Sequence, residues 1–232
     1  VVLCVFEQMG EKLDDDPRLK LLKVEWFKGK RVVDIGCNEG LISLRVAARF
    51  LCASMLGIDI DKELIRKAVR CLCTARQELG AWAAKGQCTP AVVHNWRGEH
   101  VEWMPQRGLE ALRHVTLRHE NFVASEDCAA GTVDVFLCLS VSKWIHLNWG
   151  DEGLRRLFTK VFRMLSPGGL FILEPQPWKS YRQAFRKQEM PLEVKQNLHQ
   201  LAIRPHTFPQ VLTAEIGFET VEPLGVPDGS TE

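Results

Sequence analysis

The segment at residues 30–40, KRVVDIGCNEG, restricts the fold most, because a short apolar run meets a glycine-containing turn there. An amphipathic helix is expected to follow, from about residue 41 to residue 51. A second apolar run at 54–60 ends in acidic residues and leads into a helix predicted for about 62–79. This alternation of strand and helix predicts an α/β domain built on a parallel sheet.

Three further apolar runs extend the predicted sheet, at residues 115–119, 132–140 and 169–175. The clearest helix of the chain lies between the last two, and Pro167 with Gly168 ends it. Its apolar stripe consists of Leu154, Leu157, Phe158, Val161, Phe162 and Leu165, and its other face carries Arg155, Arg156, Lys160 and Arg163. A charged face opposite an apolar stripe indicates solvated surface more often than an RNA contact.

Two regions differ from this regular pattern. Periodicity fails at about residues 80–114, which predicts an irregular insertion of roughly thirty residues. Beyond the sheet segments, a short helix is expected near 208–215 and a strand near 218–224.

A chain of 232 residues that is 46% hydrophobic can bury one core, so we expect a single domain over residues 1–232.

Charge and cysteine content limit the class of protein. The 30 Lys and Arg nearly balance the 29 Asp and Glu, so an RNA partner would need a local basic patch. The eight cysteines show no paired CxxC spacing, which favours a reducing, intracellular location without disulfides or a zinc site. The opening VVLCVF is too short to span a membrane, and its start at Val1 is what a piece of a longer chain would show.

The glycine turn predicts a cofactor loop. Gly36 and Gly40 let the backbone approach a ligand, whereas Asn38 replaces the second glycine that a dinucleotide site would want. DxGCNxG resembles the first motif of class I methyltransferases, whose loop holds the amino-acid part of S-adenosylmethionine. Asp59 ends the second strand and suits the ribose hydroxyls, with Ile60 beside the adenine. The alternative, a helix cap, fits Asp61 better than Asp59.

Two long motifs carry a more specific resemblance. Residues 137–153, LCLSVSKWIHLNWGDEG, and 165–181, LSPGGLFILEPQPWKSY, are dense in Trp, Lys, His and Asn. With residues 18–40 and 201–208 they resemble the Bicoid-interacting-protein-type RNA methyltransferases, within them most of all those that cap 7SK small nuclear RNA. The resemblance implies a class I, Rossmann-like fold whose final antiparallel strand this chain lacks, leaving an unpaired sheet edge.

The resemblance also implies the activity and its site. A methyl group would pass from S-adenosylmethionine, leaving S-adenosylhomocysteine, to the terminal 5'-phosphate of a 7SK-like or other small non-coding RNA, without a metal. It further implies a nuclear location, a monomer without membrane contact, and La-related ribonucleoprotein proteins as candidate partners. The cofactor residues would be Arg18, Gly36, Cys37, Asn38, Gly40, Asp59, Ile60, Asn121, Phe122 and Leu139. The residues positioning phosphate and RNA would be Lys143, Trp144, His146, Asn148, Trp149, Gln176, Trp178 and Arg182.

Alternatives exist for several of these roles. A tryptophan or Phe122 can simply belong to the core, Arg18 can be a solvated arginine, and Glu174 can cap a helix or orient Arg182. The family's tyrosine-rich segment before Arg18 is replaced by FEQMGEKLDDDP, and Tyr181 is the only tyrosine in the chain. Three functions therefore compete: an RNA 5'-phosphate methyltransferase acting on a triphosphate or a monophosphate, a catalytically weak RNA-binding assembly subunit, and, less favoured, a small-molecule methyltransferase.

Overall fold

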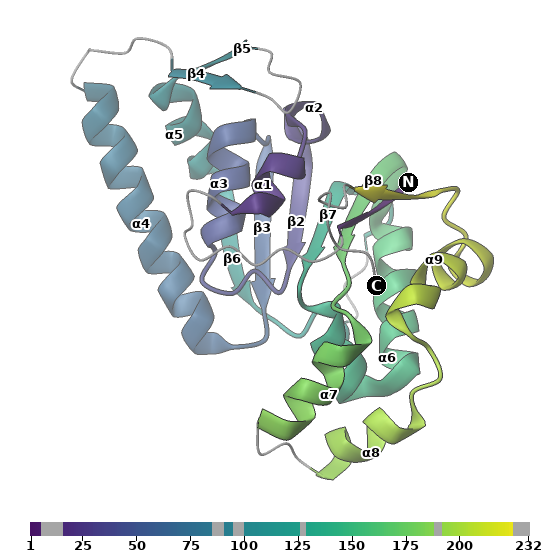
Figure 1. The fold of residues 1–232 in the computed structure, drawn as a ribbon. Coiled ribbons are helices and arrows are strands. Elements are labelled where there is room, and N and C mark those ends of the chain that lie inside the picture. The colour runs from purple at the N-terminus through teal and green to yellow at the C-terminus, as the bar shows by residue number, and fades with distance from the viewer. Residues whose placement is uncertain (6–15, 85–90, 95–99, 126–128, 188–191, 225–232) are drawn as a thin grey trace. The chain divides into compact units, whose positions relative to one another are not determined.

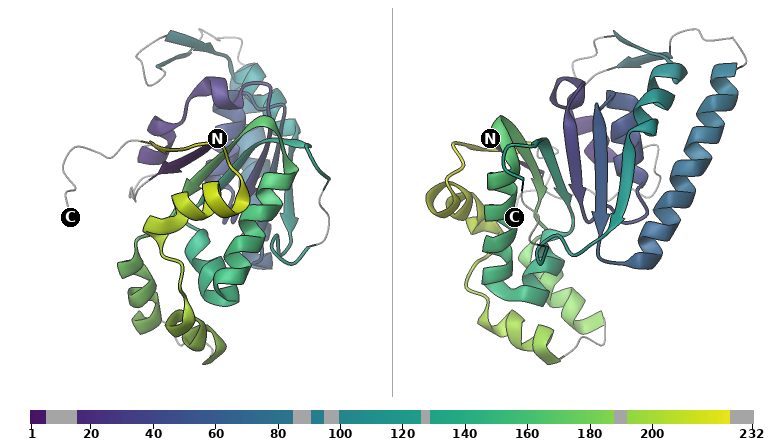
Figure 2. Two further views of the ribbon diagram at one scale, coloured as in Figure 1. Left: turned by 90° about the vertical axis from the view of Figure 1, so that its right-hand side faces the viewer. Right: turned by 180° about the vertical axis from the view of Figure 1, so that it is seen from behind.

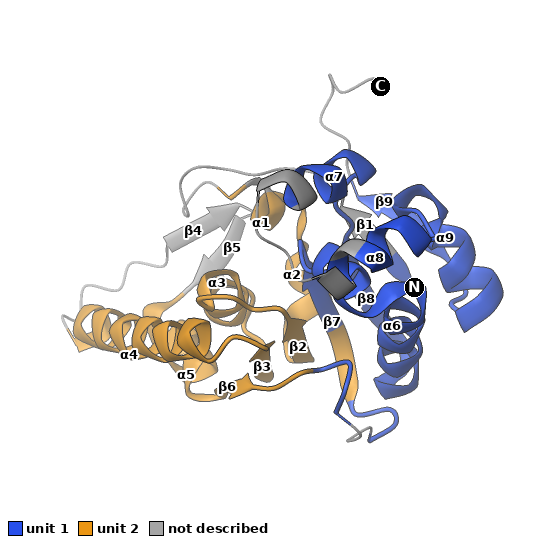
Figure 3. Ribbon diagram, turned by 90° about the horizontal axis from the view of Figure 1, so that it is seen from below, with its two compact units in different colours: residues 1–7, 122–132, 136–232 blue, residues 8–121, 133–135 orange. Residues whose placement is uncertain are grey.

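A computed structural model of the chain describes residues 1–5, 16–84, 91–94, 100–125, 129–187 and 192–224. They belong to two compact units (Figure 3). One, called here the N-terminal unit, comprises Gln8–Asn121 with Val133–Val135; the other, the C-terminal unit, comprises Val1–Glu7, Phe122–Thr132 and Phe136–Glu232. The single domain over residues 1–232 stays a prediction.

The N-terminal unit contains the predicted strand and helix alternation (Figure 1). β3 pairs in parallel with β2 on one side and with β6 on the other, with Asp34 opposite Gly57 and Gly57 opposite Leu117. Its elements are α1 (Pro17–Leu21), α2 (Val24–Phe27), β2 (Arg31–Ile35), α3 (Leu41–Phe50), β3 (Ser54–Asp59), α4 (Lys62–Ala84), β4 (Ala91–His94), β5 (His100–Trp103), α5 (Pro105–Arg113) and β6 (Val115–His119).

The expected irregular insertion contains regular elements instead. α4 continues to Ala84, β4 and β5 pair antiparallel, and α5 precedes β6. α4 and α5 lie side by side (Figure 2), and the Arg76 guanidinium donates to the carbonyl oxygen of Leu112 over 2.8 Å. α5 was missed because its buried residues include Pro105, Gly108 and Ala111, which give a weak apolar period.

The C-terminal unit contains a second set of parallel strands. β1 lies between β8 and β9 and pairs in parallel with both, for example Val2 with Phe171 and with Val221. Its elements are β1 (Val2–Val5), β7 (Val133–Leu139, whose first three residues belong to the other unit), α6 (Ser142–Met164), β8 (Leu165–Glu174), α7 (Trp178–Lys187), α8 (Leu192–Gln200), the 3-10 helix η2 (Pro205–Thr207), α9 (Phe208–Gln210), the π-helix η3 (Val211–Ile216) and β9 (Val221–Leu224).

The position of β1 was not predicted from the sequence. The sequence predicted an unpaired sheet edge because no final antiparallel strand follows residues 218–224. In the structure the opening segment β1 pairs in parallel with both β8 and β9, with Val5 opposite Leu224, and among the described strands β9 is the outermost one on this side of the sheet. The pairing joins residues at opposite ends of the sequence, and local periodicity carries no information on such a contact.

The predicted central helix is longer than expected and kinked. α6 begins at Ser142, and Gly150 interrupts its helical geometry with φ 66° and ψ −169°. The predicted stripe is largely buried, including Leu154, Leu157 and Phe158, whereas Phe162 is 40% exposed. Lys160, expected on the solvated face, is buried.

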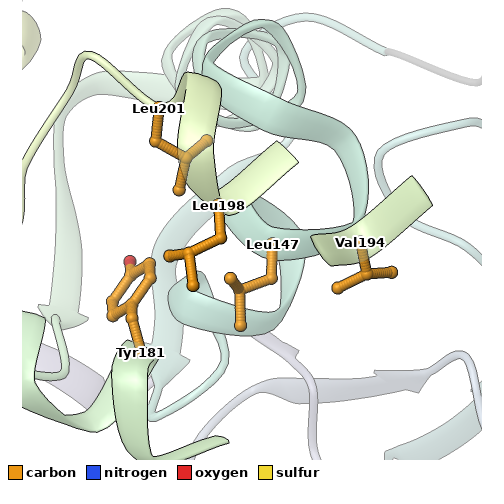
Figure 4. Close-up of a cluster of buried hydrophobic side chains, with 5 residues drawn as sticks. All are labelled: Leu147, Tyr181, Val194, Leu198 and Leu201. Atoms are coloured by element: carbon orange, nitrogen blue, oxygen red, sulfur yellow. The ribbon is translucent and has the colours of Figure 1, made fainter. Parts of the chain in front are cut away.

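Two helices that the sequence pattern did not reveal pack against α6. α8 contacts α6, and side chains from both elements, with Tyr181 of α7, form one buried cluster (Figure 4). We call it the α6–α8 cluster, and it consists of Leu147, Tyr181, Val194, Leu198 and Leu201. Trp144 and Trp178 pack against it. Among the described residues, no helix combines the length and the apolar character that a membrane span would require.

Candidate active site

The loop between β2 and α3 has the backbone geometry that its glycines predicted. Gly36 and Gly40 have φ angles of 74° and 75°, a region that an L side chain rarely adopts. Asn38 also has a positive φ, of 53°, and its Oδ1 atom accepts a hydrogen bond of 2.6 Å from the Glu39 amide. Asn tolerates this conformation because its short side chain can bond locally. The loop thus turns sharply at the N-terminus of α3.

The end of β3 is hydrogen-bonded to this loop. The amides of Gly36 and Cys37 donate to the carbonyl oxygen of Ile58, over 2.8 and 3.0 Å. Asp59 is buried, and its Oδ2 atom accepts from the Asn38 amide over 2.9 Å, while Oδ1 accepts from the Asp61 amide over 2.8 Å. A carboxylate has about four acceptor positions. The amides of Asn38 and Asp61 occupy two of these positions. Asp59 therefore keeps acceptor capacity for the two hydroxyl groups of a ligand.

The two residues after Asp59 differ in their surroundings. Asp61 caps α4, accepting from the amides of Glu63 and Leu64 over 2.7 and 3.2 Å. Ile60 is 55% exposed beside Asp59, which leaves an apolar side chain open to a ligand. The carboxylate acceptor of Asp59 therefore suits ribose hydroxyls, and the exposed Ile60 side chain suits the face of a base. These are the parts of S-adenosylmethionine assigned to the two residues.

Two other predicted cofactor residues of the N-terminal unit are occupied by internal contacts. The Cys37 side chain is buried, and burial together with the charges of Asp34 and Asp59 raises the pKa of its thiol. Arg18 forms a double hydrogen bond with Asp16, with Nη2 to Oδ2 at 2.7 Å and Nε to Oδ1 at 3.0 Å. Its predicted partner, the methionine carboxylate, would have to share the guanidinium with Asp16.

The predicted adenine contacts are divided between the units, Asn121 in one and Phe122 in the other. Asn121 is half-buried. Phe122 is buried with its ring 5.8 Å from that of Phe136, and the Lys160 ammonium lies 4.6 Å from the ring centre. Leu139 is also buried, at the end of β7. The Phe122 side chain therefore packs as core, as the alternative reading of this residue expected.

Gln176 connects Lys143, another predicted substrate residue, to Ser140 at the end of β7. Its Oε1 atom accepts from the Lys143 amide over 3.2 Å, and its Nε2 atom donates to the carbonyl oxygen of Ser140. The Ser140 hydroxyl lies 2.5 Å from Oε2 of Glu174, which is buried. Glu174 thus binds the hydroxyl of a serine at the strand end.

Lys143 and Trp144 form a pair at the start of α6. The Lys143 ammonium lies 4.7 Å from the centre of the Trp144 ring, a distance typical of a cation–π contact. Burial lowers the pKa of Lys143. Of the other predicted residues, Trp149 is 38% exposed, Asn148 donates to the carbonyl oxygen of Trp144 over 2.8 Å, and Arg182 is exposed.

His146, predicted to contact the triphosphate, is a buried internal link in this structure. Its side chain has no exposed surface; Nε2 lies 2.7 Å from Oδ1 of Asp151, and Nδ1 lies 3.2 Å from the Tyr181 hydroxyl. Asp151 also accepts from the amides of Ala202 and Ile203, over 2.8 and 3.2 Å. Both ring nitrogens are used, so His146 joins α6 to α7 rather than facing a substrate.

The structure adds one residue that sequence reasoning missed. The guanidinium of Arg204 lies 4.0 Å from the centre of the Trp178 ring. Arg204 belongs to the LAIRPHTF motif that contributed to the family resemblance, and a cation before a proline was the available signal. In the part of the chain that the structure describes, no three His, Cys, Asp or Glu side chains form a metal site.

Comparison with known proteins identifies several relatives. The family model described as Bicoid-interacting protein 3 (Bin3) matches residues 133–231. A probable RNA methyltransferase of Arabidopsis thaliana is 41% identical over 94% of this chain and 71% of its own length. The 7SK snRNA methylphosphate capping enzyme of Homo sapiens is 33% identical over 94% of this chain and 35% of its own length. The RNA 5'-monophosphate methyltransferase of Homo sapiens is 28% identical over 82% of this chain and 61% of its own length.

A solved structure supports the fold over most of the chain. Geranyl diphosphate methyltransferase in complex with S-adenosylmethionine matches with a TM-score of 0.51 at 16% identity, covering 87% of this chain and 64% of that one. At this identity the likeness concerns the fold alone. It confirms the predicted class of S-adenosylmethionine-dependent methyltransferase folds.

Proposed function

This chain belongs to the Bicoid-interacting protein 3 (Bin3) family, and on that basis we propose that it methylates a 5'-terminal phosphate of RNA with S-adenosylmethionine as donor. The relatives are named for this chemistry on 7SK RNA, on U6 RNA and on RNA 5'-monophosphates. The chain spans 71% of the Arabidopsis relative but about a third of the 7SK enzymes, 36% and 35%. The proposal therefore concerns the methyltransferase portion that they share.

The observation that carries the proposal is the contact between the β2–α3 loop and Asp59. A left-handed loop at a helix N-terminus, hydrogen-bonded to a carboxylate that ends the next strand, suits a nucleoside with an attached amino acid. Gly36, Asn38 and Gly40 would hold the amino-acid part, and Asp59 the ribose. When bound, S-adenosylmethionine supplies an electrophilic methyl group.

The reaction needs little acid–base chemistry from the protein. A terminal phosphate has a second pKa of about 6 and is largely doubly ionised at neutral pH. No general base is then required, and the chain's task is to align the phosphate oxygen with the methyl carbon and sulfur. This agrees with the buried state of His146, whose two ring nitrogens are both engaged inside the protein.

Cationic side chains of the C-terminal unit suit the phosphate. The Lys143 ammonium has no hydrogen-bonded or ion-paired partner among the described residues, and Gln176 fixes its backbone amide. Partial burial strengthens its attraction for an anion, because less water screens the charge. Arg182 is exposed one residue beyond Tyr181 and is a second candidate cation.

The finer identity of the substrate is also part of the proposal. The KWIHLNWGD segment favours a 5'-triphosphate over a monophosphate, and the natural substrate would be a 7SK-like or other small non-coding RNA. La-related ribonucleoprotein partners, a nuclear location and a monomeric state belong to the same proposal.

A catalytically weak RNA-binding subunit is the second candidate. The observation that favours it is the burial of Tyr181, the only tyrosine of the chain. The Tyr181 side chain is fully buried, and its hydroxyl lies 3.2 Å from Nδ1 of His146. No tyrosine is thus available to close over donor and phosphate. This candidate predicts cofactor and RNA binding without turnover.

The test combines the purified chain, radiolabelled S-adenosylmethionine and short RNAs with 5'-triphosphate, 5'-monophosphate or 5'-hydroxyl ends. Label that appears on phosphorylated ends and not on hydroxyl ends supports the methyltransferase. Calorimetric titration of the cofactor is run in parallel. Binding of cofactor and RNA without label transfer supports the second candidate, and absence of cofactor binding contradicts both.

A further inference from the structure

We infer that Arg204 is a further substrate-binding residue that contacts the 5'-phosphate, and that Trp178 supports its guanidinium instead of stacking on an RNA base. The inference rests on the proposed function, since it names another residue of the same substrate site. Four features of the C-terminal unit support it: the fixed backbone at Arg204, the state of its side chain, the position of Trp178, and the neighbouring Lys143–Trp144 pair.

The backbone at Arg204 is held firmly. Asp151 accepts hydrogen bonds from the amides of Ala202 and Ile203, and the Thr207 hydroxyl accepts from the Arg204 amide over 3.2 Å. The same hydroxyl donates to the Arg204 carbonyl oxygen over 2.9 Å. The position of the Cα atom is therefore set by polar contacts on both sides, which preorganises the side chain for binding.

The Arg204 side chain is only partly engaged. Its Nη1 atom donates to the carbonyl oxygens of Leu201 and, over 3.1 Å, Ile203. Among the residues with described positions, Nε and Nη2 have no hydrogen-bond partner and no carboxylate pairs with the guanidinium. Other cations of the chain are paired, such as Arg155 with Glu215 over 2.8 Å. A half-buried cation that keeps unused donors suits an external anion.

Trp178 is already covered by protein. Arg204 lies 4.0 Å from its ring centre, and the Tyr181 ring lies 4.8 Å away at an interplanar angle of 35°. A ring with these two contacts is a poor platform for an incoming base. It can instead hold the guanidinium flat, so that its donors form the fork that matches a phosphate.

A second cation–tryptophan pair lies on the same support. Trp144, whose ring contacts Lys143, and Trp178, whose ring contacts Arg204, both pack against the α6–α8 cluster. Neither cation has a carboxylate partner in the described part of the chain. Two such pairs on one rigid apolar support predict a positively charged surface for phosphate, to which Arg204 contributes bidentate hydrogen bonding.

The competing explanation is structural, because Nη1 of Arg204 also binds carbonyl oxygens just beyond α8. A residue with that role alone would change stability, but it would not change the preference for phosphorylated over hydroxyl RNA ends. The ratio of these two affinities therefore separates the explanations.

The experiment measures fluorescence anisotropy of one short RNA, labelled at its 3' end and prepared with a 5'-triphosphate or a 5'-hydroxyl. The full chain is compared with Arg204→Met, Arg204→Lys and the control Arg155→Met, and cofactor affinity is measured by calorimetry. We expect Arg204→Met to reduce the affinity ratio about tenfold and Arg204→Lys by less, with cofactor affinity and the control ratio unchanged.

An unchanged ratio in Arg204→Met overturns the inference while the proposed function stands. If Arg204→Met fails to fold, Arg204→Lys decides, because it keeps the charge but lacks the planar fork; an unchanged ratio there also overturns the inference. A wild-type protein without preference for phosphorylated ends removes the proposed function, and the role of Arg204 with it.

Discussion

The ammonium group of Lys160 lies 2.8 Å from the carbonyl oxygen of Phe122 and 4.6 Å from the centre of that residue's ring. It also lies 2.6 Å from both the carbonyl oxygen and the hydroxyl of Ser125. Lys160, near the C-terminal end of α6, therefore fixes the turn that follows β6. A lysine that sequence spacing places on a solvated face is a buried connector in the C-terminal unit.

Replacing Lys160 by Met is expected to lower the free energy of unfolding by about 1–3 kcal/mol, because the Phe122 and Ser125 carbonyl oxygens lose their donor. Urea unfolding measures the change. Arg163→Met, at an exposed position of the same helix, is the control and should stay within about 0.5 kcal/mol of wild type. Equal effects of the two substitutions would show that Lys160 is not a stabilising connector.

Asp59→Ala is expected to weaken S-adenosylmethionine binding about tenfold or more, because the carboxylate assigned to the ribose is lost and the Asn38 amide loses its acceptor. Isothermal titration calorimetry measures the dissociation constant. The matched control is Asp61→Ala, which removes the α4 cap, costs about 1 kcal/mol of stability and leaves cofactor affinity near wild type. Cofactor affinity that is insensitive to Asp59 would contradict the assigned site.

Asp34 predicts a pH dependence of stability. Burial raises its pKa to about 7, although the Ser43 hydroxyl, 2.5 Å from Oδ2, opposes the rise. The folded state then binds this proton more tightly than the unfolded state, so stability falls as pH rises from about 4 to about 7. The difference from the ordinary value of 3.8 corresponds to roughly 4 kcal/mol.

Asp34→Asn is expected to remove that pH dependence, since the amide oxygen still accepts from Ser43 and carries no charge. Unfolding free energies at pH 5, 6, 7 and 8 should fall for the wild-type chain and change less for the variant. Parallel profiles for both proteins would mean that another group causes the dependence.

Asp151→Ala is expected to lower the free energy of unfolding by about 2–3 kcal/mol, because three groups lose their acceptor: His146 Nε2 and the amides of Ala202 and Ile203. Thermal or urea unfolding measures the loss. Glu152→Ala, an exposed neighbour, should have little effect. If Asp151→Ala is as stable as the wild-type chain, the contacts of Asp151 with His146 and with the amides of Ala202 and Ile203 do not stabilise the fold.

Lys143→Ala is expected to reduce RNA methylation about tenfold or more while cofactor affinity stays near wild type, because its cation is assigned to the substrate phosphate. Lys179→Ala, at an exposed position of α7, is the control. Because burial lowers the Lys143 pKa, RNA affinity should fall with rising pH earlier than an ordinary lysine would allow. A normal methylation rate in Lys143→Ala would exclude this role.

Much of the fold follows from local patterns in the sequence. Strand and helix periodicity predicted β2, α3, β3 and β6 nearly to the residue, because each pattern is set by neighbours within a few turns. The same holds for the cofactor loop, where Gly36, Asn38 and Gly40 supply backbone conformations that their residue types allow. The helix cap formed by Asp61 also follows from its position directly before α4.

The remaining features were decided by the tertiary structure. Three features depend on packing that local patterns do not show. They are the contacts of His146 with Asp151 and Tyr181, the burial of Lys160 against residues 122–125, and the position of Arg204 on the Trp178 ring. A cation or a histidine has the same local preferences in either setting. Its burial and partners are fixed only when distant elements pack, because the free energy of an ionisable group depends on the water removed and the acceptors brought near.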